Sequence, residues 1–200
     1  MIAPGDDRLD RQIAFLREVD RLKSVERRTR TIGGARRENS AEHSWHLALS
    51  VLVLAEHAES SRLDLGRALR MALLHDLVEI DAGDTFVYDA SAMETKADRE
   101  RVAAERIFGL LPPDQGNELR ALWNEFEAGE TPEARFASAV DRWCGVFQNV
   151  ANAGGTWREH GIDADQVRAR NRSISEGAPA LWSRVDAWIE TVCEKPASNA

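Results

Sequence analysis

Apolar residues recur along the chain at the three- and four-residue spacing that is typical of amphipathic helices. In the first such segment, Leu9, Ile13, Leu16 and Val19 fall at this spacing with charged residues between them. The same pattern predicts eight helices, over residues 7–23, 40–57, 65–80, 96–111, from 114 onward, 132–151, from 163 or 165 onward, and 179–192. No segment shows the alternation of a half-buried strand. The pattern therefore predicts an all-α fold, a bundle of about eight helices without a sheet.

Residue types at the predicted helix ends support these boundaries. Thr131, Pro132 and Glu133 provide an N-cap, a proline at the first helical position and an acid in the first turn. Ser40 and Asp64 are good N-caps for the helices that follow them.

Length and composition are those of a single globular domain. Two hundred residues, of which 43% are hydrophobic, suffice for one sizeable core. The formal net charge of −8 argues against a nucleic acid polymer as the partner. We expect no membrane association, because no apolar run is long enough to span a bilayer and no secretory signal is visible. Cys144 and Cys193 lie outside any CxxC pattern and are expected to be reduced thiols of a cytoplasmic protein.

A basic stretch from residue 25 to 39, VERRTRTIGGARREN, interrupts the helical pattern. It contains two adjacent glycines and has no periodicity, so it is expected to be a loop. One interpretation is an ordinary solvated loop. The other is an anion-binding loop, because a phosphate-bearing substrate of an acidic protein needs a local reversal of charge.

The stretch LLHDLVEIDAGD, residues 73–84, places four ionisable side chains in or beside an apolar segment. They are His75, Asp76, Glu79 and Asp84. Buried imidazoles and carboxylates are costly unless they are paired, hydrogen-bonded or bound to a metal ion. On a helix, His75 and Glu79 share a face, and His75 and Asp76 can both reach one ion above the groove between them. The alternative is a solvated helix face with an acidic end.

Two further polar residues fall on apolar helix faces. His43 precedes Leu47 by four residues, and Asp141 lies within an apolar set on the helix over 132–151. A core histidine is usually only hydrogen-bonded, and a buried aspartate can form a salt bridge or a cap, so each residue alone is ambiguous. Together with His75 and Asp76 they make a mixed nitrogen and oxygen donor set, which suits a divalent transition ion with open positions.

Three motifs, RENSAEHSWHLAL (residues 37–49), LLHDLVEIDAGD (73–84) and AVDRW (139–143), resemble those of the HD-domain metal-dependent phosphohydrolases, in particular the 5′-deoxynucleotidase branch. The resemblance covers roughly residues 10–175 and implies a single HD domain over 1–200, with the helix 179–192 packed on that core. It implies one divalent ion, which could be Mn, Co, Mg, Fe, Ni or Zn. The metal ligands that it implies are His43, His75, Asp76 and Asp141. Glu79 and Asp84 would position or activate the attacking water.

The substrate implied by the resemblance is a (deoxy)nucleoside 5′-monophosphate, from which the protein would remove phosphate. Arg28 is expected to bind the phosphate, with Arg37 or Arg36 as a second contact. The branch pattern has an Arg-Trp pair in the loop before the first histidine, whereas the aligned region here reads RRTR over residues 27–30. The missing tryptophan leaves the base and sugar preference open.

Three other interpretations remain at this level. The chain could be a phosphodiesterase, a nucleoside triphosphohydrolase, or a non-catalytic nucleotide-sensing HD dimer. Long basic insertions that would hold a triphosphate are absent from the sequence. The resemblance also suggests a homodimer, with Trp182 and Trp188 as interface residues.

Overall fold

All eight predicted helices are present in the computed structural model, which describes residues 7–193. They are α1 (Arg8–Val19), α2 (Ser40–Leu54), α3 (Leu65–Leu74), α6 (Lys96–Phe108), α7 (Pro113–Ala128), α8 (Pro132–Ala151), α10 (Ala164–Asn171) and α12 (Pro179–Cys193). The short helical segments between them are η1 (Asp20–Ser24), η2 (Ala55–His57), α4 (Glu79–Ala82), α5 (Ala90–Glu94), α9 (Gly155–Glu159) and α11 (Ile174–Gly177). The all-α class is confirmed. The ends of the predicted domain, residues 1–6 and 194–200, lie outside the described residues.

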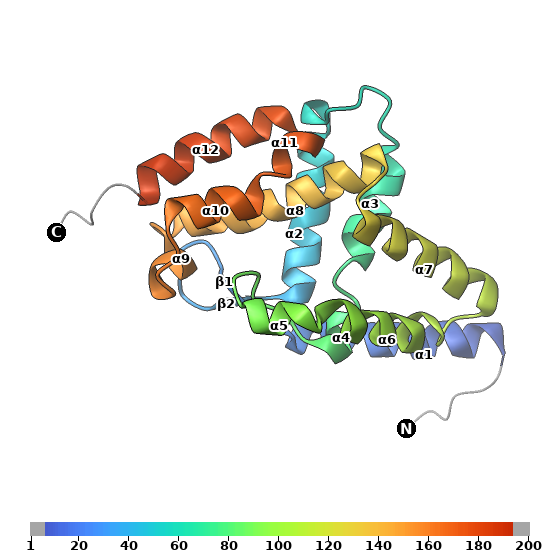
Figure 1. The fold of residues 1–200 in the computed structure, drawn as a ribbon. Helices are drawn as coiled ribbons and strands as arrows, with labels where there is room; N and C mark the ends of the chain where they lie inside the picture. The colour runs from blue at the N-terminus through green and yellow to red at the C-terminus, as the bar shows by residue number, and fades with distance from the viewer. Residues whose placement is uncertain (1–6, 194–200) are drawn as a thin grey trace.

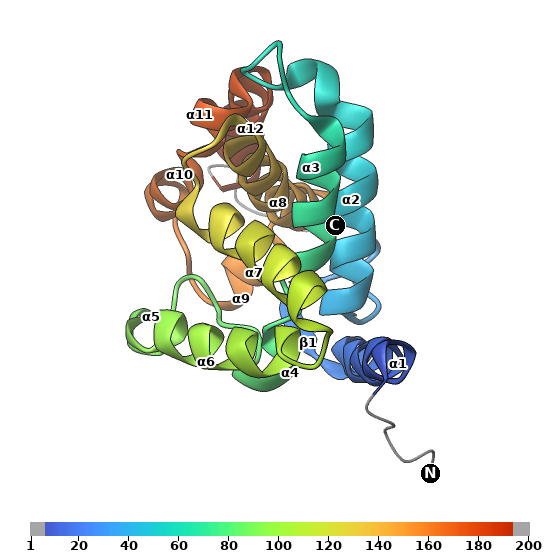
Figure 2. The ribbon, with the colours of Figure 1, turned by 90° about the vertical axis from the view of Figure 1, so that its right-hand side faces the viewer.

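Helix α8 is the central element of the bundle. It packs against α2, α3, α7, α11 and α12, and in Figure 1 it runs through the middle of the molecule. Helices α4 and α6 pack together and α1 contacts α6, and Figure 2 shows all three at the lower end of the bundle.

Two hydrophobic clusters form the core, one on each side of the stretch that follows α3. The first includes Leu77, Val78 and residues of α6 and α7, and the second includes Val140, Cys144 and residues of α2 and α12. The polar residues His43, His75 and Asp76 are buried between these apolar neighbours. These polar residues therefore lie next to both clusters.

The basic stretch before α2 forms a hairpin, so the expectation of a loop without any strand is wrong. Strands β1 (Glu26–Arg30) and β2 (Arg37–Asn39) pair antiparallel, and Gly33 and Gly34 take positive φ values of 93° and 70° in the turn. The sequence lacks apolar alternation because the side chains that point inward, Arg27 and Glu38, are charged. They are stabilised by ion pairs in the site rather than by apolar contacts.

The helix predicted over 65–80 ends at Leu74, which corrects the placement of His75, Asp76 and Glu79 on its last turns. His75 is the C-cap, and the next residues form tight turns in which Leu77 N–H donates to Leu74 O (3.1 Å) and Glu79 N–H donates to Asp76 O (3.0 Å). Gly83 ends α4 with φ of 73°. In these turns the side chains of His75 and the adjacent Asp76 lie close together, whereas a regular helix would direct them about 100° apart.

The cap of α2 is Asn39, one residue before the predicted Ser40. Asn39 and Glu42 form a reciprocal capping box, because the Asn39 side chain accepts from Glu42 N–H and the Glu42 side chain accepts from Asn39 N–H. Ser40 is therefore free to donate its hydroxyl elsewhere. The predicted caps Asp64 and Thr131 are confirmed. In residues 7–193, no helix has the length and apolar character needed to cross a membrane.

Candidate active site

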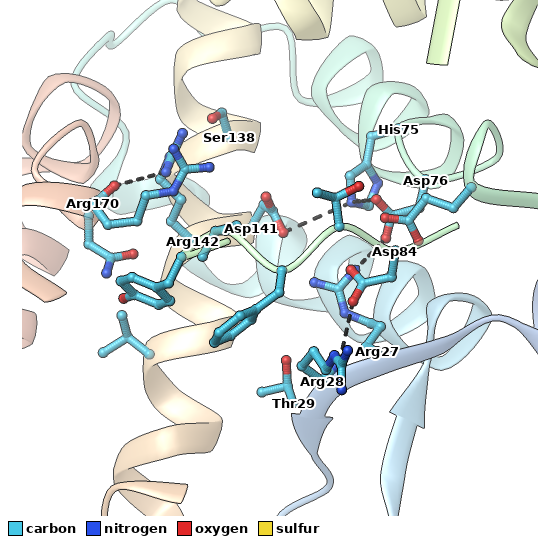
Figure 3. A pocket seen from close by; sticks show the side chains of 18 of the residues that line it. Arg27, Arg28, Thr29, His75, Asp76, Asp84, Ser138, Asp141, Arg142 and Arg170 are labelled. Atoms are coloured by element: carbon cyan, nitrogen blue, oxygen red, sulfur yellow. Dashed lines mark hydrogen bonds and ion pairs between the residues drawn. The ribbon is translucent and has the colours of Figure 1, made fainter. Parts of the chain in front are cut away.

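Three side chains from different helices meet at the centre of the molecule. His43 comes from α2, His75 from the end of α3 and Asp141 from α8, and one ligand atom of each lies within 4.8 Å of the other two. His43 Nε2 lies 2.9 Å from Asp141 Oδ1, and His75 Nε2 lies 4.0 Å from the same oxygen. Figure 3 shows Asp141 pointing toward His75 across the site. Three of the four predicted metal ligands therefore converge.

The fourth predicted ligand, Asp76, borders this group. Its Oδ1 lies 3.0 Å from His75 Nε2, and its Oδ2 accepts a hydrogen bond from Arg27 (2.7 Å). Asp76 is not among the three side chains that form the close group. Its carboxylate is nevertheless buried beside the cluster, with one oxygen turned toward it.

Both imidazoles are oriented as metal-binding histidines usually are. His75 Nδ1 lies 2.9 Å from the Ala72 carbonyl, which can only accept, so Nδ1 carries a proton and Nε2 is the ring nitrogen that faces the cluster. His75 Nε2 is buried and makes no hydrogen bond within the described residues. In His43, Nε2 faces Asp141 and Nδ1 lies 3.5 Å from Glu38 Oε2. A carbonyl or carboxylate behind the ring is the usual support of a ligating histidine, so these residues fit a divalent ion.

The charges of the cluster also suit a cation. Burial alone would lower the pKa of His43, but its contacts with Asp141 and Glu38 outweigh burial and raise that pKa to about 9. Burial likewise opposes ionisation of Asp141, yet the neighbouring histidines hold its pKa well below the usual range. Without a bound ion, the neighbouring carboxylates therefore favour protonated imidazole rings at His43 and His75. A divalent ion at this place would displace those protons.

Glu79 and Asp84 lie next to the cluster and line the same pocket. Glu79 is buried and accepts a hydrogen bond from the Ser40 hydroxyl (2.6 Å), and burial together with the charge of Asp76 raises its pKa to about 8. Asp84 is half-buried, and burial raises its pKa against the opposing charge of Arg27. Its Oδ2 accepts from the backbone N–H of Arg28 (3.3 Å), which ties this loop to strand β1.

A cavity of about 270 Å³ opens from the cluster, and the two predicted substrate arginines differ in their relation to it. Arg28 lines it, and no carboxylate within residues 7–193 forms an ion pair with its exposed side chain. Arg37 lies on β2 outside the lining of the cavity. Arg36, the other candidate, is engaged by Glu42 in a two-pronged ion pair at 2.7 Å. Arg28 is thus the only one of the three that is directed to the pocket and without an acidic partner.

Sequence reasoning missed the supporting role of the hairpin. Arg27 donates to Asp76 (2.7 Å) and lies 3.7 Å from Glu38 Oε2, and Glu38 Oε1 accepts from Gln148 Nε2 (2.6 Å). Arg27 therefore contacts Asp76, and Glu38 lies beside Nδ1 of His43. The available signal was two charged residues, one on each side of a glycine turn, in a segment interpreted as either a solvated loop or an anion-binding loop.

The pocket also has a basic end that the sequence interpretation did not include. Arg170 lines the pocket together with Arg142 and Ser138. Nη1 of Arg142 donates to the Arg170 carbonyl (2.9 Å). The only sequence signal for Arg142 was its position next to Asp141 on α8. Lys96, which is paired with Glu100, is a further cation in the lining.

Comparison with known proteins agrees with this geometry. The HD domain family matches residues 19–182. The human 5′-deoxynucleotidase HDDC2 is 34% identical over 131 residues, which are 65% of this chain and 62% of that protein, so the match spans less than two thirds of the relative. The fission yeast 5′-deoxynucleotidase hdd1 is 26% identical over 136 residues, 66% of this chain and 67% of that protein.

Solved structures show the same fold. A structure from Magnetospirillum magnetotacticum, described as a predicted metal-dependent phosphohydrolase, is 45% identical and covers 97% of both chains with a TM-score of 0.90. The PH0347 protein of Pyrococcus horikoshii is 25% identical, with 88% of this chain and 99% of that chain covered and a TM-score of 0.64. The family match extends over most of the chain and includes every residue of the central cluster, and the chain belongs to the HD domain family.

Proposed function

We propose that the protein is a metal-dependent phosphohydrolase that removes phosphate from (deoxy)nucleoside 5′-monophosphates. The observation that carries this proposal is the close group of His43, His75 and Asp141, of which His75 and Asp141 line a pocket that Arg28 also lines. The similarity to relatives named 5′-deoxynucleotidases supports the nucleotide as the substrate.

The proposed ligands of one divalent ion are His43, His75, Asp76 and Asp141. Asp76 is included because its Oδ1 is turned toward His75 and its charge would help to balance the ion. Mixed imidazole and carboxylate donors suit several divalent ions, so the identity among Mn, Co, Mg, Fe, Ni and Zn is left to measurement. When bound, the ion supplies a Lewis acid that makes water more acidic and neutralises charge on phosphoryl oxygens.

Glu79 and Asp84 are the proposed acid and base. Hydrolysis requires a group that takes a proton from the attacking water and one that gives a proton to the departing 5′ oxygen as the bond to phosphorus breaks. Burial raises the pKa of both carboxyl groups, so a proton can reside on one of them near neutral pH. The Ser40 hydroxyl fixes one oxygen of Glu79, and the Arg28 N–H fixes one oxygen of Asp84.

Arg28 is the proposed phosphate contact. Its backbone is held to Asp84, while its guanidinium has no carboxylate partner in the described residues and so retains its full charge for a substrate. Arg27, one residue earlier, is neutralised by Asp76 and is not available in the same way.

Phosphate release from a panel of nucleotides, with Mn²⁺, Co²⁺ or Mg²⁺ added in turn, tests the proposal. We expect release from 5′-monophosphates and none from the same protein after treatment with a chelator. Release from diesters or triphosphates alone would instead support a phosphodiesterase or a triphosphohydrolase. No release with any metal would favour a nucleotide-sensing protein.

We also propose that the protein is a cytoplasmic homodimer. On α2, Trp45 is 66% exposed, with Leu49, Leu52 and Val53 also exposed on that helix. Ring contacts lead from Trp45 through the side chains of α2 and α8 to Trp188, one of the two expected interface residues. Light scattering on the eluting protein measures the assembly, and Trp45→Glu should shift a dimer to a monomer. A monomeric wild-type protein would refute the dimer.

A further inference from the structure

Two arginines form a second cationic region of the pocket, on the other side of Asp141 from Arg27 and Arg28 (Figure 3). Arg142 comes from α8 and Arg170 from α10, so the region exists only because these helices meet. Figure 3 shows the two side chains next to each other at the end of the pocket away from His75.

Neither guanidinium is neutralised. Within residues 7–193, no carboxylate lies in ion-pair range of Arg142 or Arg170, whereas Arg27 in the same pocket is paired with Asp76 and Glu38. The Nε atom of each is buried and makes no hydrogen bond in the described structure. Two like charges that are partly removed from water cost free energy, and an unpaired buried donor adds to that cost. The arrangement is therefore unfavourable until an anion is present.

A purely structural role explains only part of this pair. Arg142 donates one hydrogen bond to the Arg170 carbonyl near the end of α10, which is a favourable place for a cation. Within the described part of the chain, the side chain of Arg170 makes no hydrogen bond or ion pair that would account for its position in the lining. Burial and the neighbouring charge of Arg142 also lower the pKa of Arg170, as expected of a cation that lacks a counter-ion.

We propose that Arg142 and Arg170 bind a second phosphate group of the substrate, while the phosphate to be removed lies at the metal cluster beside Arg28. The substrate class is thus a nucleotide with two phosphate groups, and the planar guanidinium fork suits such an oxyanion. The second group could lie on the sugar, as in a 3′,5′-bisphosphate, or on the first phosphate, as in a 5′-diphosphate. This inference rests on the proposed phosphohydrolase activity and refines its substrate.

The kinetic test compares deoxyadenosine 5′-monophosphate with the 3′,5′-bisphosphate and the 5′-diphosphate in the presence of Mn²⁺. We expect kcat/KM for one of the two doubly phosphorylated compounds to exceed that for the monophosphate by about tenfold or more, as a charge-assisted contact allows. The compound that shows the preference identifies the source of the second phosphate.

The variants Arg170→Gln and Arg142→Gln should each reduce this preference to nearly one. Arg170→Gln is the cleaner variant, because it removes no hydrogen bond that the side chain makes within the described structure. Arg172→Gln is the matched control, since Arg172 is exposed two residues along and does not line the pocket. Equal losses for all three substrates in Arg170→Gln, or no preference in the wild-type protein, would overturn the proposal.

An equilibrium measurement separates this inference from the proposed activity. Calorimetry compares the binding of deoxyadenosine 3′-monophosphate and of the methylene-bridged 5′-diphosphate with the binding of deoxyadenosine. We expect Arg170→Gln to weaken one of the two phosphorylated ligands about tenfold more than deoxyadenosine. That result without any turnover would reject the phosphohydrolase and retain the phosphate subsite, whereas turnover with unchanged binding in Arg170→Gln would reject the subsite alone.

Discussion

At the scale of single residues, the central cluster brings acidic and imidazole side chains close to one another. Asp141 is the carboxylate that faces both His43 and His75, and its pKa is held low by those rings. Removing it leaves Nε2 of His43 without its carboxylate partner and takes one of two nearby carboxylates away from Nε2 of His75.

We therefore expect Asp141→Ala to lose its metal during dialysis, because a charged ligand leaves the coordination shell. Elemental analysis of the dialysed protein measures the retained ion per chain. Asp98→Ala, at a position whose side chain is 85% exposed, is the control and should retain the ion. Unchanged metal in Asp141→Ala would show that the ligand set is wrong.

Arg28→Ala should lower kcat/KM for a 5′-monophosphate tenfold or more while leaving the metal content intact. A charge-assisted contact to phosphate contributes roughly 1.5–3 kcal/mol, and the loss should appear mainly in KM. Arg37→Ala tests the second predicted phosphate contact. We expect a smaller loss of kcat/KM in this variant, because Arg37 lies outside the pocket lining. Steady-state kinetics that show no change in Arg28→Ala would move the phosphate site elsewhere.

Glu79→Gln and Asp84→Asn should each reduce kcat by about a hundredfold or more, the usual scale for a lost acid or base. Both variants keep the shape of the side chain, so metal content and nucleotide binding should change little. Turnover is measured beside elemental analysis and a substrate titration. Metal lost in parallel with activity would assign these residues to the coordination shell, and full activity would leave them structural.

At the scale of elements, the β1–β2 hairpin supplies residues that contact the proposed metal ligands His43 and Asp76. Glu38 is buried, lies 3.5 Å from His43 Nδ1 and accepts from Gln148. Arg27 on the opposite strand holds Asp76. The hairpin thus contacts two proposed ligands, His43 on α2 and Asp76 in the stretch after α3. These two residues are 33 positions apart in the sequence.

Glu38→Gln should weaken metal binding about tenfold to a hundredfold, the typical effect of losing the group that supports a ligating histidine. The amide keeps a hydrogen-bond acceptor for His43 but removes the negative charge near Arg27. Competition with a fluorescent chelator measures the metal affinity. Glu26→Gln, at an exposed position of the same hairpin, should bind metal as the wild-type protein does. Equal affinities in the two variants would exclude a supporting role for Glu38.

At the scale of the whole molecule, the second hydrophobic cluster joins α2, α8 and α12 around Cys144. This thiol is buried, and burial raises its pKa to about 12. It is therefore protonated and shielded whenever the bundle is intact.

In the Cys193→Ser variant, we expect the remaining thiol of Cys144 to be unreactive toward a disulfide reagent at pH 8 and to react fully in denaturant. The absorbance of the released chromophore gives the number of reactive thiols. The unsubstituted protein, assayed in denaturant, gives the total of two thiols as the control. Rapid reaction of Cys144 without denaturant would contradict a closed cluster.

The sequence by itself determined the helices and most of the central polar residues. The start of the helix predicted over 132–151 agrees with α8, because Thr131 and Pro132 define that start by local chemistry. His43, His75 and Asp141 could be singled out because they are ionisable residues at apolar helix positions. Burying such a group costs free energy unless it has a partner. These signals depend only on residues that are near each other in the chain, so they can be recognised in the sequence alone.

Only the tertiary structure decided how these residues are supported and where the pocket extends. Arg27 and Glu38 resemble any charged residues of a solvent-exposed turn until α8 and the stretch after α3 pack against the hairpin. Arg170 lies on a helix whose own sequence gives no sign that α8 brings Arg142 beside it. Ion pairing between distant segments leaves no periodic pattern in the chain. For that physical reason the proposed metal ligands could be predicted, whereas the residues that contact them and the second basic region could not.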